Sequence, residues 1–153
     1  GFVSSMTITG SLDRFIYNTS NNTQPATSLF MQTSNISANT VDILAGSGLH
    51  VHQNSTFTNI YTNTLRIASG ASLELRRNLD VYGNVVNEGT ITGAATFAVS
   101  GNMRNEGVVN ASTTFNIYGD VESNGSVSGS STWNVYGNLI APGVFTVANF
   151  SIS

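Results

Sequence analysis

A pattern of apolar, small and polar positions, twelve residues long, occurs five times in this chain. Each copy starts with isoleucine or valine, continues through mostly small residues to two apolar residues that flank a single residue, and ends on Asn or Asp. The copies begin at Ile43, Ile67, Ile91, Val109 and Val127, so the first two steps between starts are six residues longer than the last two. Repeats of this length are typical of stacked coils, in which each repeat buries its apolar side only against its neighbours.

From Leu79 to Phe145, an apolar residue occupies every sixth position. On an α-helix, a step of six residues turns by about 600°, which spreads these residues around the helix. On an extended strand, six is a multiple of two, so all of them point to one side. Most positions four residues further along hold glycine or another small residue, as corners require. We therefore expect an all-β protein in which each six-residue unit is a short strand and a corner.

Three such units close a triangular coil of eighteen residues, so we predict a single-stranded β-solenoid (a triangular β-helix) with coils of eighteen and, in its earlier part, twenty-four residues. One coil does not fold alone, because its backbone order costs about 1–2 kcal/mol per residue and its buried side chains contribute about 1.5–3 kcal/mol each. The longer coils favour a right-handed helix, where insertions are easier to place. The solenoid is expected to span residues 36–153 in about five to six coils, and residues 1–35, which do not match the repeat, to form an N-terminal cap or extension.

Two rows of polar side chains are expected along the solenoid axis, because equivalent positions in successive coils lie about 4.8 Å apart. The first row follows the apolar pair and consists of Asn54, Asn78, Asn102, Asp120 and Asn138. The second row stands four residues before the next repeat and consists of Asn39, Asn63, Asn87, Asn105 and Ser123. Asn tolerates the left-handed conformation of corners, and stacked amides hydrogen-bond to one another. We interpret both rows as structural ladders.

The low charge of the chain narrows the function classes. Only 8% of its residues are charged, against roughly 25% in ordinary soluble proteins. The five basic residues are all arginine and are too few to follow a phosphate backbone, so we expect no nucleic-acid partner. No stretch approaches the roughly 20 apolar residues of a membrane helix, so we expect no membrane insertion. The chain has no cysteine, which excludes disulfides and Cys-based metal sites.

A polar, uncharged surface without lysine indicates a secreted, extracellular or cell-surface protein. Sequons at Asn18, Asn21 and Asn35 are candidate glycosylation sites of such a protein.

His50 and His52 are candidate metal ligands, since they share one side of a strand. Glu74 lies one coil away in the predicted alignment and is the candidate third ligand. The alternative is a pair of solvated histidines beside an exposed Glu–Arg pair. We expect this alternative, with no bound metal and no other cofactor.

Glu88 and Glu106 occupy equivalent positions in adjacent coils, so their carboxylates are expected within about 5 Å of each other. Retaining glycosidases use a similar separation. However, no third acid and no long insertion frames a cleft, and Arg104 is close enough in sequence to compensate the charge. We therefore predict that the protein is not an enzyme.

Small and hydroxyl-bearing residues occupy many outward positions of the later coils. They are Thr92, Ala94, Thr96, Asn110, Ser112, Thr114, Ser128, Ser130 and Thr132. A flat array of hydroxyl groups orders water, and ice-binding β-solenoids are built in this way. A separate file of Tyr82, Tyr118 and Tyr136 is a candidate contact surface for a partner, a glycan or a cell surface, or simply covers the strands beneath it.

Two short motifs carry family resemblances over roughly residues 36–153. The motif Asn-Glu-Gly-x-Ile/Val, at Asn87–Ile91 and at Asn105–Val109, resembles the haemagglutinin-like repeats of bacterial surface adhesins, which are β-solenoids. The Gly-Asp-Val motif at Gly119–Val121 resembles, more weakly, the triangular β-helix of bactofilins. Both resemblances imply a solenoid, the first on a bacterial surface and the second in a polymer.

The expected function is that of an extracellular structural subunit that assembles head to tail with copies of itself into a filament or surface appendage. The last coil, near Phe150 and Ile152, lacks the charges, proline or covering segment that protect open strand edges. A second copy can add there through its first coil or its N-terminal apolar residues. These residues are Phe2, Val3, Met6 and Ile8. Contacts of this type do not close, so they produce a fibre. The alternatives are a binding module from a larger adhesin and an ice-binding protein.

Overall fold

The chain folds into a β-solenoid whose strands follow three faces in turn. The computed structural model describes residues 15–17, 28–31, 34–51 and 58–153, and none of these is helical. We name the faces A, B and C in the order in which residues 96–111 visit them. The all-β solenoid predicted from the sequence is confirmed.

Each face is a stack of parallel strands, one from each coil. Face A contains β3 (Ser34–Ser37), the first part of β6 (Thr58–Ile67), the first part of β8 (Leu79–Asn87), β10 (Thr96–Val99), β13 (Thr114–Ile117), β16 (Thr132–Val135) and β19 (Asn149–Ile152). Face B contains β1 (Phe15–Tyr17), β4 (Thr40–Ile43), the second parts of β6 and β8, β11 (Met103–Asn105), β14 (Val121–Ser123) and β17 (Leu139–Ile140). Face C contains β2 (Ser28–Met31), β5 (Gly48–Val51), β7 (Ser72–Leu75), β9 (Thr90–Gly93), β12 (Val108–Ala111), β15 (Ser126–Ser128) and β18 (Val144–Phe145).

The strands β6 and β8 continue through the corner between faces A and B. They join these two faces into one 12-stranded sheet, whereas face C is a separate 7-stranded sheet. Every strand pair in both sheets is parallel, as expected when each strand pairs with its equivalent in the next coil.

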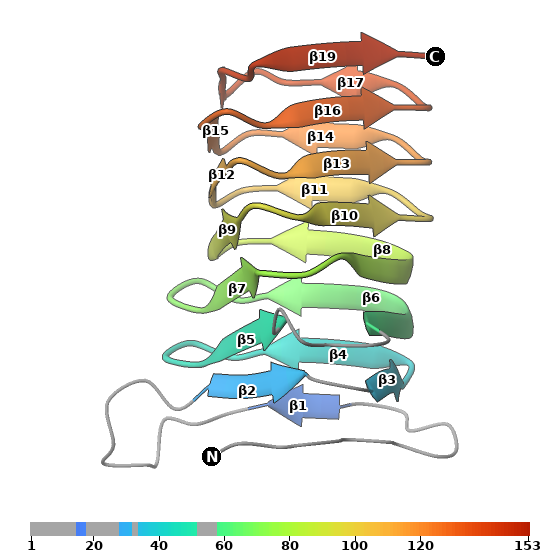
Figure 1. Ribbon diagram of the computed structural model, residues 1–153, viewed down its shortest axis with the longest axis vertical. Helices are drawn as coiled ribbons and strands as arrows, with labels where there is room; N and C mark the ends of the chain where they lie inside the picture. The colour runs from blue at the N-terminus through green and yellow to red at the C-terminus, as the bar shows by residue number, and fades with distance from the viewer. Residues whose placement is uncertain (1–14, 18–27, 32–33, 52–57) are drawn as a thin grey trace.

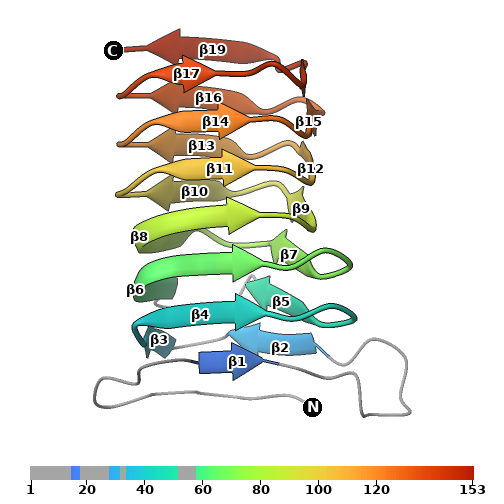
Figure 2. The ribbon, with the colours of Figure 1, turned by 180° about the vertical axis from the view of Figure 1, so that it is seen from behind.

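The coils are right-handed, as predicted. In Figure 1, β10, β13 and β16 lie nearer the viewer and run from left to right, while β11 and β14 lie behind them and run from right to left. The chain rises from its N-terminus to its C-terminus in this view. Figure 2 shows the same relation from behind, with β11 and β14 in front. Strands that cross the front from left to right as the chain rises describe a right-handed screw.

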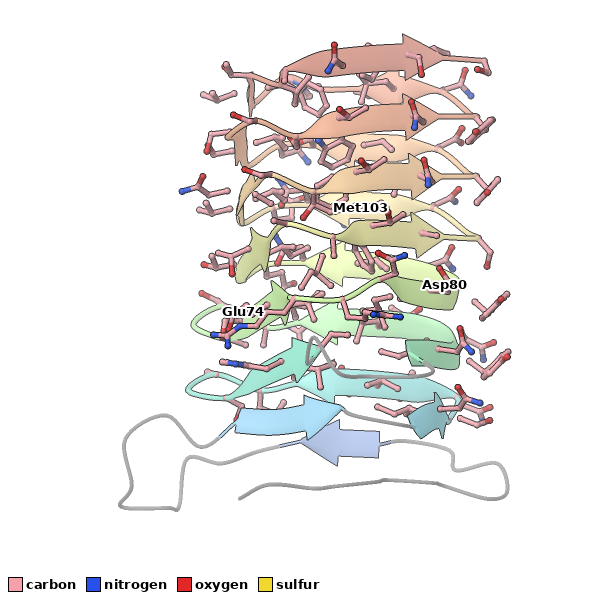
Figure 3. The ribbon with its side chains drawn as sticks, in the orientation of Figure 1. Glu74, Asp80 and Met103 are labelled. Atoms are coloured by element: carbon pink, nitrogen blue, oxygen red, sulfur yellow. The ribbon has the colours of Figure 1, made fainter. Side chains whose placement is uncertain are left out.

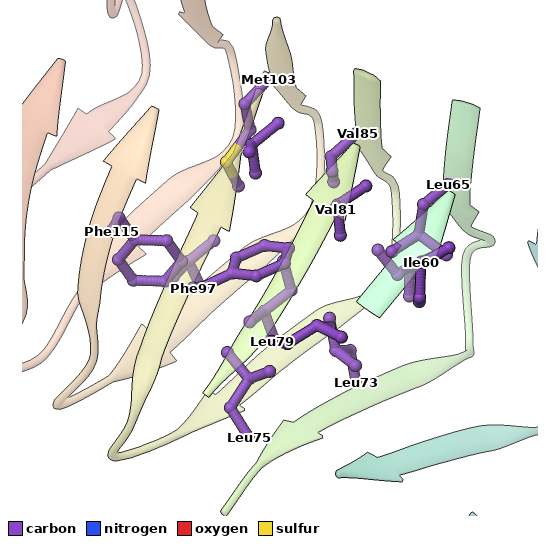
Figure 4. Close-up of a cluster of buried hydrophobic side chains, with 14 of the residues drawn as sticks. Ile60, Leu65, Leu73, Leu75, Leu79, Val81, Val85, Phe97, Met103 and Phe115 are labelled. Carbon is purple, nitrogen blue, oxygen red and sulfur yellow. The ribbon is translucent and has the colours of Figure 1, made fainter. Parts of the chain in front are cut away.

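The core is a single column of apolar side chains along the axis, because every second residue of each strand points inward. The strands β10, β13 and β16 alternate half-buried and buried residues, and the buried ones form continuous inward rows. The rings of Phe97 and Phe115 meet edge to face at 5.8 Å, and Phe115 stacks on Trp133 at 4.2 Å. Figure 4 shows Leu75 and Leu79 packed beside Phe97 in the same cluster.

The predicted alignment of the repeats is wrong for the first two copies. Leu73 pairs with Ile91 and not with Phe97, and Ile67 pairs with Asn87 instead of Ile91. The first two copies are therefore displaced by one face relative to the last three. Their apolar pairs lie on face C, whereas the pair that begins at Phe97 lies on face A.

The early coils are longer, as predicted, but the additional residues are divided among all three corners. On face C, Gly48 pairs with Ser72 and Ser72 pairs with Thr90, so the first of these steps is six residues longer than the second. Six residues (52–57) separate β5 from β6 along the chain, whereas three (76–78) separate β7 from β8. The corner within β6 has one residue more than that within β8, where the register shifts between Tyr61 and Thr64. The corner from face B to face C has four residues after β6 (68–71) and two after β8 (88–89).

The described strands before residue 36 continue the solenoid. Phe15 of β1 pairs with Val41 on face B, and Ser28 of β2 pairs with Gly48 on face C. The boundary expected at residue 35 falls inside β3. These strands therefore extend the stack of coils in the N-terminal direction.

Candidate functional site

The candidate assembly surface is the edge formed by the last strand of each face, β17, β18 and β19. On face A, Phe150 pairs in register with Trp133 and Ile152 pairs with Val135. Trp133 and Val135 are 0% and 1% exposed, whereas Phe150 and Ile152 are 41% and 57% exposed. The same inward rows are thus covered within the solenoid and uncovered at this edge.

The aromatic core continues up to this edge. Phe145 packs edge to face on Trp133 with the ring centroids 5.3 Å apart, and Phe150 packs on Phe145 at 5.8 Å. Ile140 and Val144 are also exposed, but they follow outward rows and pair with Glu122 and Ser126. Among the large exposed apolar residues of these three strands, Phe150 and Ile152 are therefore the ones that belong to inward rows.

The two ends of the described chain visit the faces in the same order. The strands β1, β2 and β3 lie on faces B, C and A, and so do β17, β18 and β19. In the sheet orders, β1 and β2 stand at one end, while β19 and β18 stand at the other. A second solenoid on the same axis would therefore continue all three faces with parallel strands.

Several residues predicted as functional lie outside the described residues. They are Phe2, Val3, Met6, Ile8, Asn18, Asn21, His52 and Asn54. The third candidate sequon, at Asn35, is exposed on β3, and the side-chain oxygen of Asn35 accepts a hydrogen bond from Asn59 Nδ2 at 3.1 Å.

The first polar ladder contains three of the predicted residues and one that was missed. The backbone N–H of Asp120 donates to Asn102 Oδ1 at 2.8 Å, and that of Asn138 donates to Asp120 Oδ1 at 2.7 Å. Below Asn102 the ladder continues with Asn84, whose Oδ1 accepts from the Asn102 N–H at 2.9 Å. Asn78 belongs to a different corner, where its Oδ1 accepts from the backbone N–H of Thr96 at 3.0 Å. The prediction of Asn78 was wrong because it rested on the displaced alignment.

The second polar ladder is confirmed for its last three members. Asn87 Nδ2 donates to Asn105 Oδ1 at 2.8 Å, and Asn105 Nδ2 donates to Ser123 Oγ at 3.1 Å. All three side chains are fully buried. Asn39 and Asn63 are exposed and form a separate pair, in which the Asn63 N–H donates to the Asn39 carbonyl at 2.9 Å. They do not continue the buried ladder.

His50 and Glu74 are neighbours on face C, as predicted. His50 Nδ1 lies 2.8 Å from Glu74 Oε2, while Arg76 Nε binds the other oxygen of the same carboxylate at 2.6 Å. Burial lowers the pKa of His50, although the Glu74 charge opposes this shift. Figure 3 shows Glu74 on β7. No group of three His, Asp or Glu side chains suitable for a metal occurs among the described residues.

Glu88 and Glu106 share one row, as predicted, but each carboxylate is bonded to other side chains. Glu88 forms an ion pair with Arg66. Glu106 Oε1 accepts from Arg104 Nε at 2.6 Å and from Asn124 Nδ2 at 2.8 Å. The hydrogen bonds from Asn124 and Arg104 hold the pKa of Glu106 below its usual value. A general acid needs a raised pKa, so this row has the character of a charge-paired surface.

A depression of about 440 Å³ lies over face B, between the first polar ladder and the outward row that ends at Ile140. Its polar groups bond mainly to one another or to adjacent surface residues. Asp120 Oδ1 accepts from Asn138, and Glu122 Oε1 accepts from Asn124 at 2.9 Å. These groups therefore offer few free hydrogen-bonding atoms to a ligand.

The predicted hydroxyl array forms only in part. Thr96, Thr114 and Thr132 pair in register and form a regular row. Thr92 belongs to β9 on face C, however, and Thr96 belongs to β10 on face A. A corner separates the two strands, so the prediction of one flat hydroxyl surface is wrong.

The predicted tyrosine file lies on face A and includes a fourth ring. Tyr61 stacks on Tyr82 with the centroids 4.7 Å apart, and Tyr118 stacks on Tyr136 at 4.9 Å. The interplanar angle is 7° in both pairs. Ser100 occupies the position between the pairs, since its N–H donates to the coil below as the N–H groups of Tyr118 and Tyr136 do.

A column of polar side chains runs beside the tyrosines on the same face. In register order its members are Asn35, Asn59, Asp80, Asn116, Asn134 and Ser151, with Ala98 interrupting the column between Asp80 and Asn116. Asn59 bonds to Asn35 at 3.1 Å, and Asn134 bonds to Asn116 at 2.8 Å. Sequence reasoning missed Asp80 as a member because the displaced alignment placed Glu74 there; the signal was Tyr82, which continues the tyrosine file two residues later.

No protein-family model matches this chain, and comparisons with curated proteins and with solved structures find no significant match. The resemblances to adhesin repeats and to bactofilins therefore stay predictions. In the part of the chain that the structure describes, we find no helical segment with the length and apolar character that crossing a bilayer requires.

Proposed function

We propose that this chain is an extracellular structural subunit whose solenoid stacks head to tail with further copies into a filament. The observation that carries the proposal is the exposure of Phe150 and Ile152, which continue rows of buried side chains to the end of β19. The low charge and the absence of lysine support the extracellular location.

The edge lacks the features that usually prevent strand addition. Residues 143–153 include no charged side chain, and the nearest proline, Pro142, stands in the corner before β18 and not in β19. Exposed strand edges without charge or proline are templates for another strand. Since the first and last described coils visit the faces in the same order, a second copy can supply strands to all three faces at once.

Apolar contact alone does not account for a stable filament. Covering the exposed parts of Phe150 and Ile152 contributes about 2 kcal/mol, less than the roughly 4–15 kcal/mol that association costs. The remainder has to come from backbone hydrogen bonds along β17, β18 and β19, each worth about 0.5–1.5 kcal/mol. We therefore expect assembly to depend strongly on concentration.

Sedimentation velocity over a wide concentration range, with electron microscopy of the same samples, tests this proposal. The wild-type chain is expected to form axial polymers, and Ile152→Glu to stay monomeric because it places a charge in the inward row. The control is Val108→Glu, which adds the same charge at an exposed valine on β12 in the middle of face C. It is expected to polymerise like the wild type.

Two outcomes would overturn the filament. One is a wild-type chain that is monomeric at every concentration, and the other is a polymer that Ile152→Glu leaves unchanged. A monomer is the outcome expected of the alternative, a binding module of a larger adhesin, in which following coils would cover Phe150 and Ile152. The outward columns of face A favour this alternative as the second candidate.

A further inference from the structure

The two outward columns of face A are interrupted in the same coil. The tyrosine column is broken by Ser100, which lies in the corner that follows β10. The polar column is broken by Ala98, two residues earlier on β10. The stacked tyrosine pairs and the hydrogen-bonded asparagine pairs resume on both sides. One rung is therefore missing from both columns at the same height along the solenoid.

The missing rung leaves a notch of about 310 Å³. It is lined by Asp80, Val81, Tyr82, Ala98, Ser100 and Tyr118. Strand spacing separates Tyr82 from Tyr118 by about 9.6 Å, two steps of about 4.8 Å. A ring inserted midway would lie about 4.8 Å from each tyrosine, close to the 4.7 and 4.9 Å found within the pairs. The volume is at the lower end of the roughly 300–1,000 Å³ of ligand pockets, so the notch fits one ring.

The polar groups at the notch offer an acceptor on one side and a donor on the other. Asp80 on β8 (Figure 3) presents a half-buried carboxylate to which no described residue donates a hydrogen bond. Asn116 is not a lining residue of the notch but pairs with Ala98 from the next coil. Its Oδ1 accepts from Asn134, and its Nδ2 donates to no described residue, so this donor can serve a ligand seated over Ala98. Ser100, a lining residue from the tyrosine column of the same coil as Ala98, adds a hydroxyl that both donates and accepts.

We propose that this notch binds one pyranose ring of a glycan. The C–H faces of a sugar ring pack on tyrosine rings, and its hydroxyl groups can donate to Asp80 and accept from Asn116 at the same time. A guanidinium group stacks on aromatic rings but only donates hydrogen bonds, so it leaves the Asn116 donor unpaired. An unsubstituted aromatic ring satisfies neither group. The notch is on a side face, away from the assembly edge, so this inference does not depend on filament formation.

The test is binding of the methyl glycosides of glucose, galactose, mannose and N-acetylglucosamine, followed through amide NMR shifts. We expect at least one of them to shift the amides of Ala98 and Ser100, with a dissociation constant on the order of 1 mM, as a single ring with few contacts gives. Sorbitol, which has hydroxyl groups and no ring, and methylguanidinium serve as control probes and are expected to bind at least tenfold more weakly.

Three variants separate the notch from the rest of face A. Ser100→Tyr supplies the missing ring, so it is expected to abolish sugar binding while the protein stays folded, with an unchanged or higher Tm. Asp80→Asn is expected to weaken binding about tenfold. Tyr136→Ala removes a ring of the same column outside the notch and is expected to bind as the wild type does.

Three results would overturn the proposal. They are the absence of shifts at the notch with every methyl glycoside, equal binding of methylguanidinium, and sugar binding that Ser100→Tyr leaves intact. The Ile152→Glu protein, which tests assembly, is expected to keep full sugar binding, so failure of one proposal is distinguishable from failure of the other.

Discussion

Asn87 donates through Nδ2 to Oδ1 of Asn105 over 2.8 Å, and both side chains are fully buried inside the solenoid. The Nδ2 groups of Asn87 and Asn105 each find an acceptor in the next coil, so the ladder fixes the register of the corner between faces B and C. At the start of the ladder, where Asn87 pairs with Ile67 of the coil below, the buried Oδ1 of Asn87 has no hydrogen-bond partner among the described residues. The same bond pattern repeats one coil later, from Asn105 to Ser123.

Asn105→Ala removes the middle of this ladder. We expect a loss of about 2–3 kcal/mol in the free energy of unfolding, because the change deletes hydrogen bonds to both neighbours and leaves buried polar atoms unpaired. Urea unfolding followed by circular dichroism measures it. Asn110→Ala, at an exposed position on face C, is the matched control and should change stability by no more than about 0.5 kcal/mol. Equal effects at the two positions would contradict a structural role for the ladder.

Gly107 marks a corner where successive coils approach too closely for any side chain. A Cβ built there would lie 2.2 Å from the Gly89 carbonyl oxygen, and Gly125 stands in the same relation to Gly107. Gly107→Ala therefore has to move the backbone of two coils, and we expect it to cost about 3 kcal/mol.

Gly70→Ala is the comparison for this glycine variant. Gly70 has a φ of +79°, but its Cβ would meet nothing closer than 3.7 Å. Only the left-handed backbone opposes this substitution, at about 1–2 kcal/mol. Thermal unfolding of both variants should rank Gly107→Ala as the more damaging one, and the opposite order would show that the coils separate readily at this corner.

The stability of the protein is expected to fall on mild acidification because of His50. Burial lowers the pKa of His50 from its usual 6.5, against the opposing effect of Glu74. Below pH 6.5 the unfolded chain therefore binds a proton that the folded chain still excludes, and the free energy of unfolding decreases until the pH passes the folded pKa. The decrease is measured by urea unfolding at a series of pH values.

His50→Gln should remove this part of the pH dependence. The chain has only two histidines, so the imidazole signal that is lost in the His50→Gln spectrum assigns the titration of His50. A pKa of His50 above 6.5 would show that the Glu74 charge outweighs burial, and would reverse the sign of the expected change.

The solenoid and its triangular coil were predictable from the sequence because strands bury every second residue. From Leu79 onward an apolar residue every sixth position is enough to specify three short strands per coil. The buried ladder of Asn87, Asn105 and Ser123 was also predictable, since it lies within coils of constant length.

The alignment of the early coils was not predictable from the apolar pattern. All three faces present the same alternation, so a displacement of one face, as between Leu73 and Phe97, leaves every apolar residue pointing inward. The six additional residues are spread over three corners, so no single insertion marks the change. The notch was missed for the same reason, because the displaced alignment put Glu74 where Asp80 lies.

The corrected register can be tested directly by cross-linking, since the chain has no cysteine of its own. Glu74 pairs with Thr92 on face C, and both side chains point outward. Their Cα atoms are expected about 4.8 Å apart, within the roughly 4.4–6.8 Å that a disulfide spans. The double variant Glu74→Cys with Thr92→Cys should therefore oxidise to an intramolecular disulfide, visible as faster migration on a non-reducing gel. The one-coil loop that it closes should raise the free energy of unfolding by roughly 3 kcal/mol.

The control is Glu74→Cys with Ala98→Cys, the pair aligned by the apolar pattern alone. Ala98 lies on face A and pairs with Asp80, so this variant should keep two free thiols. Rapid oxidation of the control, with no disulfide in the first variant, would restore the alignment in which Leu73 and Phe97 are equivalent and would remove Asp80 from the notch.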